Sequence, residues 1–373
     1  MLKQLINSIV RNGMNIPGKR LKGRFLVFES DDWGSIRTPS IEAISSLESR
    51  GVPFRSLPIK EFSLFDTLES NSDLNGLYDV LSKYRDIQGH PVVFTLIGNG
   101  ANPDYEKIRE NGFSRYEYEP YTKTLDRYSN RDRVHQLHRK AIDEGLAFPS
   151  FHGREHLNVC RWMRLLQANN TSAHLLFDHG VCNYSFGINS EDLGELAAAF
   201  DIEFEQDIEY QKNVIKDGLN LFEKLWGFKS QYFVPPNGPY SQNLNFTTKE
   251  CGITGLYAAR IQRMPLGNGQ IQKRYNWMGT RNQEGLIYIN RNGFFEPTYM
   301  PDPIDNALLA IERAFRWHKP AVISSHRVNY CGELSPENRS NSLKLLDELL
   351  KKVLQRWPDI QFIHSENLIN LYK

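Results

Sequence analysis

The chain is organised around the stretch Phe25-Leu26-Val27-Phe28-Glu29-Ser30-Asp31-Asp32-Trp33-Gly34. Its first four residues form an apolar run that is typical of a buried strand, and an acidic cluster follows directly. In α/β proteins the carboxyl ends of parallel strands gather at one edge of the sheet, where binding and catalytic side chains lie. The stretch therefore predicts a functional site at the end of a strand.

A second stretch has the same design. The run Leu146–Phe151 is followed by His152-Gly153-Arg154-Glu155-His156. Two histidines four positions apart fall on one face of a helix and can bind one metal ion, with an aspartate from another strand completing the ligand set. A third strand-like run, Ala321–Ser325, ends at His326. These three convergent stretches favour a metal-dependent hydrolase.

The acidic cluster has two interpretations. If residues 29–32 are extended, Glu29 and Asp31 face one way and Asp32 faces the other, so that one carboxylate could bind the metal while its neighbour accepts a proton. The alternative is structural, because Ser-Asp-Asp also caps helices and turns.

The remaining pattern alternates strands with helices. Strands are expected near residues 90–98, 230–234, 253–258, 286–289, 321–325 and 360–363, and helices near 41–47, 133–145, 156–167, 190–200, 208–225, 244–251, 306–318 and 343–357. Residues 100–130 lack a firm period and are expected to form a long excursion over the mouth of the fold. The alternation predicts a mostly parallel sheet or barrel in one domain, 21–373. An N-terminal helical extension, 1–20, precedes it, and its amphipathic segment 2–10 is expected to pack on the domain rather than on a membrane.

Composition narrows the class of protein. A net charge of +1 gives no bulk field that would recruit nucleic acid or an anionic membrane. The four scattered cysteines argue against a disulfide framework and against a cysteine zinc site. No stretch reads as a signal peptide or a membrane span, so a cytoplasmic protein is expected.

The order of these motifs resembles the polysaccharide deacetylases, carbohydrate esterase family four. It consists of the Asp31-Asp32 pair, the His152–His156 pair, the strand end Val234-Pro235-Pro236-Asn237-Gly238, and the late His326. The resemblance runs from Phe25 to about Ile363. It implies a distorted (β/α)7 barrel that removes acetyl groups from N-acetylated or O-acetylated sugars of a polysaccharide or glycan precursor.

The resemblance also implies roles for individual residues. Asp31 would be the catalytic base and His326 the general acid, while Asp32, His152 and His156 would hold a divalent metal. Zinc is the first expectation for that metal, with cobalt, nickel and iron as alternatives. Substrate contacts are expected from Trp33, Arg154, Pro235, Pro236, Asn237 and Arg327.

Two departures from the family pattern stand out. The third motif usually carries an arginine that orients the base, but Val234 and its neighbours stand there, which leaves Arg154, Arg327 or Arg260 as candidate replacements. The aspartate that tunes the acid histidine has no match, although Trp277 could be its associated aromatic. Glu29 and Glu155 are additional acids that could change metal ligation or substrate.

Three other functions stay open. One is a metal-dependent hydrolase of another amide or ester, and a second is a catalytically weak relative that binds carbohydrate. A two-carboxylate glycosidase fits less well, because it would leave the histidine pair without a role.

Overall fold

The computed structural model describes residues 12–57, 59–184 and 193–373. The expected helix over residues 2–10 therefore lies outside the described residues. The described part of the predicted extension packs on the domain, since the Lys19 N–H donates to the carbonyl of Met278 at 2.8 Å and Nζ of Lys319 donates to the carbonyl of Gly18 at 2.6 Å. In the described part of the chain no helix is both long and apolar enough to cross a membrane.

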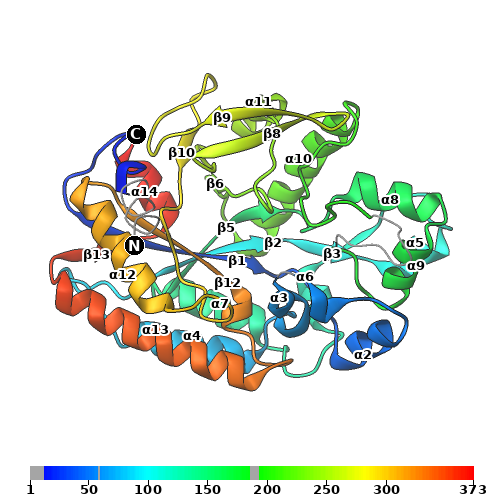
Figure 1. Cartoon of the computed structure of the whole chain (residues 1–373), viewed down its shortest axis with the longest axis horizontal. Coiled ribbons are helices and arrows are strands. Elements are labelled where there is room, and N and C mark those ends of the chain that lie inside the picture. The colour runs from blue at the N-terminus through cyan, green and yellow to red at the C-terminus, as the bar shows by residue number, and fades with distance from the viewer. Residues whose placement is uncertain (1–11, 58, 185–192) are drawn as a thin grey trace.

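The centre of the molecule is a nine-stranded sheet whose strands pair in parallel. Along the sheet the order is β10-β7-β6-β5-β2-β1-β12-β11, with β13 paired to β1. The strands are β1 (Arg24–Trp33), β2 (Phe94–Asn99), β5 (Ala147–Gly153), β6 (Tyr232–Phe233), β7 (Gly255–Tyr257), β10 (Ile287–Ile289), β11 (Gly293–Phe294), β12 (Ala321–His326) and β13 (Ile360–Phe362). The sheet curls into a half-barrel with helices around it (Figure 1), which confirms the predicted α/β class.

Helices connect the strands and cover the sheet. They are α2 (Ile41–Ser49), α3 (Lys60–Phe65), α4 (Asn71–Ser82), α5 (Tyr105–Glu110), α6 (Tyr121–Leu125), α7 (Val134–Asp143), α8 (Val159–Gln167), α9 (Thr171–Asp178), α10 (Asp207–Trp226), α11 (Asn245–Glu250), α12 (Pro303–Arg316), α13 (Pro336–Arg356) and α14 (Ser365–Leu371). Helices α4, α12 and α13 share one apolar core with β1 and β2, and α10 shares another with β5 to β7. A third cluster joins α2, α8 and α9, at the side of the barrel.

Local signals in the sequence set several helix starts. Ser40 caps α2 as predicted, since its hydroxyl accepts from the Ala43 N–H at 3.2 Å. Ser70 and Asp73 form a reciprocal capping box at the start of α4.

Three expectations need correction, and one hairpin was not expected. The helix expected at 156–167 begins only at Val159, and the part of the expected helix 190–200 that is described, 193–200, is not helical. The segment 100–130 contains β3 (Ala101–Pro103), α5, β4 (Tyr118–Pro120) and α6 instead of an irregular excursion. The hairpin β8 (Ile261–Gly267) and β9 (Gln270–Tyr275) was not predicted, although Asn268-Gly269 at its tip has the left-handed backbone of a tight hairpin turn.

Candidate metal centre and active-site cavity

The acidic cluster sits on a β-bulge at the end of β1. Between Ser30 and Trp33 the strand advances three residues while β2 advances two, from Leu96 to Gly98. Asp32 is the residue with positive φ, +79°, a conformation that aspartate tolerates better than most residues. The bulge breaks the strict alternation expected of an extended strand, so Asp31 and Asp32 both line one cavity.

A second bulge presents His152. Between Phe151 and Gly153, β5 advances two residues while β2 advances one, and Gly153 has φ +126°. The chain then turns, so His156 lies in the loop before α8. The expectation that both histidines share one helical face is therefore wrong. They nevertheless converge, with ring centroids 5.1 Å apart.

Asp32, His152 and His156 form a buried group that could hold a metal ion, with one ligand atom of each within 4.8 Å of the others. Oδ1 of Asp32 lies 3.2 Å from Nε2 of His156 and 3.6 Å from Nε2 of His152. A tetrahedral ion with bonds of about 2.1 Å would place its ligand atoms about 3.4 Å apart. The donor set and its spacing therefore fit a divalent metal such as zinc.

Hydrogen bonding fixes the tautomer of His152. Its Nδ1–H donates to the Val234 carbonyl at 2.7 Å, so in the neutral imidazole, the form that binds metal, Nε2 carries the lone pair. This Nε2 is buried without a hydrogen-bond partner and faces a carboxylate oxygen. Two acceptors in contact with each other repel unless a cation lies between them. A backbone carbonyl that holds the second nitrogen is the usual support of a metal-binding histidine.

The ionisation states suit the same role. Burial would raise the pKa of Asp32, but His156, His152 and Arg37 hold it well below its ordinary value. Burial lowers the pKa of the His156 imidazole in spite of the nearby Asp32. An ionised aspartate and a neutral imidazole are the forms that bind metal.

Asp31 is held by Arg291, which follows β10. The two terminal nitrogens of Arg291 donate to the two carboxylate oxygens of Asp31 at 2.6 and 2.7 Å, while its Nε donates to Glu29 at 2.6 Å. Tyr257 lies 4.7 Å from the guanidinium. Burial raises the pKa of Asp31, but the pair with Arg291 outweighs this effect and lowers it below the ordinary value.

Arg291 thus occupies the position for which Arg154, Arg327 or Arg260 had been expected, and that expectation is wrong. Arg154 pairs with Glu155 and Asp217, Arg327 with Asp66 and Glu69, and Arg260 with Asn15. Glu29 is a partner of Arg291 and Glu155 a partner of Arg154, so each extra acid is engaged by an arginine. Arg291 follows a short apolar strand, the same signal that marked His326, and that signal could have found it.

His326 ends β12 and is paired in register with Asp31 of β1. Its Nδ1 lies 2.6 Å from Glu296, and its Nε2 lies 3.9 Å from Oδ2 of Asp31. Burial lowers the pKa of His326, but Glu296 and the two aspartates raise it to about 9. Glu296 therefore supplies the carboxylate that had no match in the sequence. Phe62 is the aromatic against His326, whereas Trp277 stacks on Tyr275.

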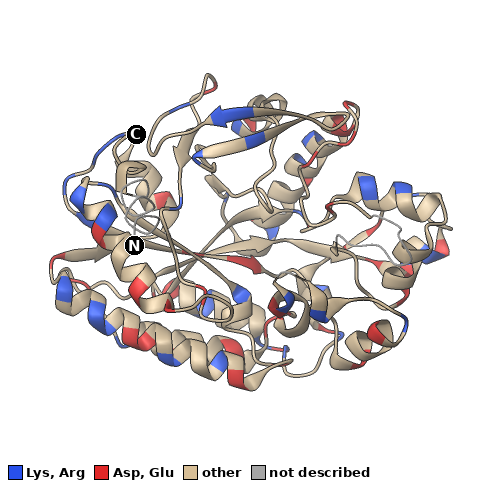
Figure 2. Ribbon diagram, in the orientation of Figure 1, with Lys and Arg blue, Asp and Glu red and all other residues tan. Residues whose placement is uncertain are grey.

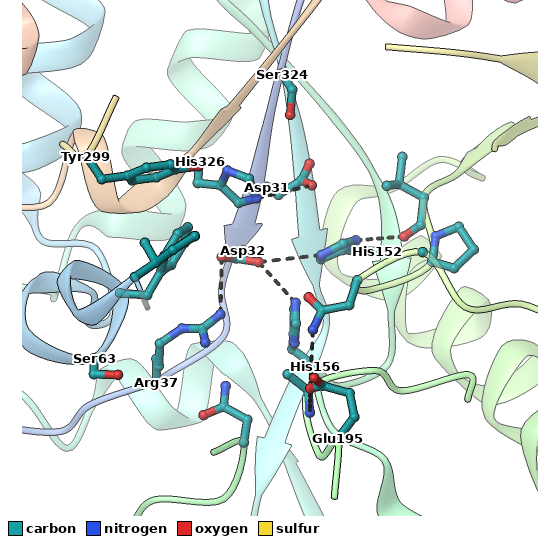
Figure 3. Close-up of a pocket in the computed structure, with 18 of the residues that line it drawn as sticks. Asp31, Asp32, Arg37, Ser63, His152, His156, Glu195, Tyr299, Ser324 and His326 are labelled. Atoms are coloured by element: carbon teal, nitrogen blue, oxygen red, sulfur yellow. Dashed lines mark hydrogen bonds and ion pairs between the residues drawn. The ribbon is translucent and has the colours of Figure 1, made fainter. Parts of the chain in front are cut away.

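These groups line one cavity of about 560 Å³. Figure 3 shows Asp31, Asp32, His152, His156 and His326 converging on it from β1, β5, the following loop and β12. Of the expected substrate contacts, Pro235 and Asn237 line the cavity. Trp33, Arg154 and Arg327 lie elsewhere: Trp33 donates to Ser30 beneath the bulge, and the two arginines are in the ion pairs described above. The neighbour Pro236 is outside the cavity lining as well.

Charge on the outer helices is mixed. Figure 2 shows basic and acidic residues interspersed along α13, while the end of β1 at the centre of the sheet is acidic.

Comparisons with known proteins give similarity in structure only. No protein-family model and no curated protein matches the sequence. A structure from Mycobacterium smegmatis, assigned as a polysaccharide deacetylase, is 10% identical with TM-score 0.46, over 95% of this chain and 93% of that one. A structure from Pseudomonas aeruginosa PAO1, also assigned as a polysaccharide deacetylase, is 10% identical with TM-score 0.42, over 93% of this chain and 90% of that one. The 4-alpha-glucanotransferase from Thermococcus litoralis is 9% identical with TM-score 0.46, over 94% of this chain and 40% of that one.

Proposed function

We propose that this protein is a metal-dependent deacetylase that hydrolyses the acetamide of an N-acetylated sugar in a glycan or glycan precursor. The observation that carries the proposal is the contact between Nε2 of His152 and Oδ1 of Asp32, two buried acceptors 3.6 Å apart beside His156. This arrangement is best explained by a cation bound among the three side chains, with zinc as the first candidate.

A divalent metal at such a site lowers the pKa of water and polarises an acyl carbonyl. The chain's own residues would then handle the protons. Asp31, kept ionised by Arg291, takes the proton from the attacking water. Arg291 also restricts the carboxylate to one orientation, because its planar fork binds both oxygens.

His326 is the group proposed to protonate the leaving nitrogen. Its paired carboxylate, Glu296, keeps the imidazole charged at neutral pH, so a proton is available when the C–N bond breaks. Base and acid lie on adjacent strands in matched register, with Nε2 of His326 3.9 Å from Oδ2 of Asp31. The two proton transfers would therefore take place on one side of the substrate.

The cavity suits a sugar. Its walls carry the aromatic rings of Phe62, Tyr257, Phe294 and Tyr299, and Pro235 and Asn237 line it as well. Aromatic faces pack against the C–H groups of a sugar ring, and the tyrosine hydroxyls can hydrogen-bond with its hydroxyls. We also propose that residues 21–373 form one domain around this cavity.

A non-catalytic carbohydrate-binding function was suggested by the arginine missing from the third motif. Arg291 makes the contact with Asp31 that this arginine would make, so the missing arginine no longer supports the non-catalytic alternative. The two-carboxylate glycosidase has no use for the Asp–His–His group.

The test is acetate release from a panel of N-acetylated and O-acetylated sugars, with the protein reconstituted with zinc or cobalt and then treated with a chelator. We expect acetate from an N-acetylated member of the panel, loss on chelation, and recovery when metal returns. Release that is indifferent to chelation would contradict the proposal.

A further inference from the structure

One cation in the cavity takes part in neither proton transfer of the proposed chemistry. Arg37 follows the bulge of β1, lines the cavity, and has 14% of its side chain exposed. Figure 3 places its guanidinium beside Asp32, on the side away from His152.

The two cavity arginines differ in how far their donors are used. Arg291 makes four hydrogen bonds with Asp31, Glu29 and Ser324. Arg37 makes one, from Nε to Asp66 at 3.2 Å, and its Nη2 lies 3.5 Å from Oδ2 of Asp32, an oxygen without a hydrogen-bond partner. Among the described residues, Nη1 of Arg37 has no hydrogen-bond partner and Nη2 has only the 3.5 Å ion pair with Asp32, so this guanidinium keeps donors for a ligand in addition to Nε2 of His326, the proposed acid.

Buried side chains outside the cavity lining hold the guanidinium of Arg37 in place. Asp66 also accepts hydrogen bonds from the buried Arg327, at 3.1 and 3.2 Å, and Arg327 is fixed in turn by Glu69 at 2.9 Å. The ring of Phe62 lies 5.2 Å from the guanidinium carbon of Arg37. A fork held rigidly by buried partners is suited to bidentate recognition of an anion, because little side-chain entropy is lost on binding.

A second polar group, Asn183, lines the same cavity, and its neighbour Tyr184 hydrogen-bonds to Thr38, the residue after Arg37, at 2.7 Å. Asn183 is 4% exposed, and its Oδ1 is buried without a hydrogen-bond partner. A buried acceptor of this kind needs a donor, and a sugar hydroxyl can supply it. Ser63 also lines the cavity, and its carbonyl accepts from the Thr38 hydroxyl at 2.8 Å.

We propose that Arg37 and Asn183 form a subsite for an acidic sugar, in which Arg37 binds a carboxylate of the substrate and Asn183 accepts from a neighbouring hydroxyl. The substrate class is then an N-acetylated sugar of the uronic-acid type. Arg37 acts here as a specificity-determining residue. This inference rests on the proposed deacetylase function and specifies that the substrate carries a negative charge.

The test compares two probes that differ in one group, the methyl glycosides of N-acetylglucosamine and N-acetylglucosaminuronic acid. Each is titrated into the full chain reconstituted with zinc, and ligand-detected NMR measures binding while the acetate methyl signal reports turnover. Arg37→Gln removes the cation, and Arg37→Lys keeps the charge without the fork. Arg263→Gln on the exposed face of β8 is the matched control, because it removes the same charge outside the cavity.

We expect wild type and Arg263→Gln to bind the uronate about tenfold or more tightly than the neutral sugar, and Arg37→Gln to lose that preference. Arg37→Lys should retain only part of it. Equal binding of both probes by wild type, or an undiminished preference in Arg37→Gln, would overturn the inference. If zinc binding and acetate release from the neutral sugar persist in that case, the proposed function survives without the acidic subsite. If zinc does not bind at all, both fail.

Discussion

Arg291 binds both carboxylate oxygens of Asp31, at 2.6 and 2.7 Å, although the two residues lie 260 positions apart in the chain. The same guanidinium holds Glu29, two residues before Asp31 on β1. One arginine after β10 therefore fixes both acidic side chains that face it from β1. The proposed base gains its orientation and its ionisation from this single contact.

Arg291→Lys is expected to lower kcat for acetate release about 10- to 100-fold while the zinc content stays at the wild-type level. Lysine keeps the charge but cannot bind two oxygens in a plane, so the base loses its alignment. Steady-state kinetics with metal analysis of the same preparations measures both quantities. Wild-type kcat in this variant would remove Arg291 from the mechanism.

The pH profile depends on His326. Its pKa is raised to about 9, so the acid form is present at neutral pH and is lost as the pH rises through about 9. The kcat should therefore fall on the alkaline side near that pH. In Glu296→Gln the carboxylate that raises the pKa is gone, and the alkaline limb should move to lower pH. A limb that stays in place would show that another group controls it.

Gly153 makes the turn between the two histidines, with φ +126° and the Glu155 carbonyl 3.2 Å from where a Cβ would lie. Gly153→Ala should cost about 1–3 kcal/mol of stability and also weaken zinc binding, because the strain acts on both ligands. Gly51→Ala is the control, since Gly51 also has positive φ, +92°, but has open space around it and lies after α2. Thermal unfolding and zinc titration of both variants separate the two effects. Equal zinc affinity in the two variants would argue against a positioning role for Gly153.

Much of the fold could be predicted from apolar runs and their spacing. The strands that carry Asp31, His152 and His326 were each marked by a buried run ending in polar residues, because parallel strands bury both faces and expose their ends. The convergence of these three residues follows from that pattern.

The features that were not predicted depend on local backbone geometry and on contacts between distant segments, which the residue types alone do not indicate. The bulges at Asp32 and His152 each insert one residue into the strand and change the direction of a side chain. A prediction that assumes strict alternation of side chains along the strand places that side chain on the other face of the sheet. Arg291 and Glu296 were missed because their partners are known only once the curled sheet brings the segments after β10 and β11 to the ends of β1 and β12. The substrate contacts expected for Arg154 and Arg327 were wrong for the same reason, because both side chains form ion pairs with nearby acidic residues.

The central claim is that Asp32, His152 and His156 bind one metal ion, and the direct measurement is the metal content of untagged protein after zinc reconstitution and desalting. The wild type should retain about one zinc per chain, as should His90→Ala, which removes an exposed histidine that precedes β2 and does not line the cavity. The double variant His152→Ala/His156→Ala should retain none, with a circular dichroism spectrum like that of the wild type. Wild-type protein that binds no zinc or cobalt, or a double variant that binds as much as the wild type, would contradict the account.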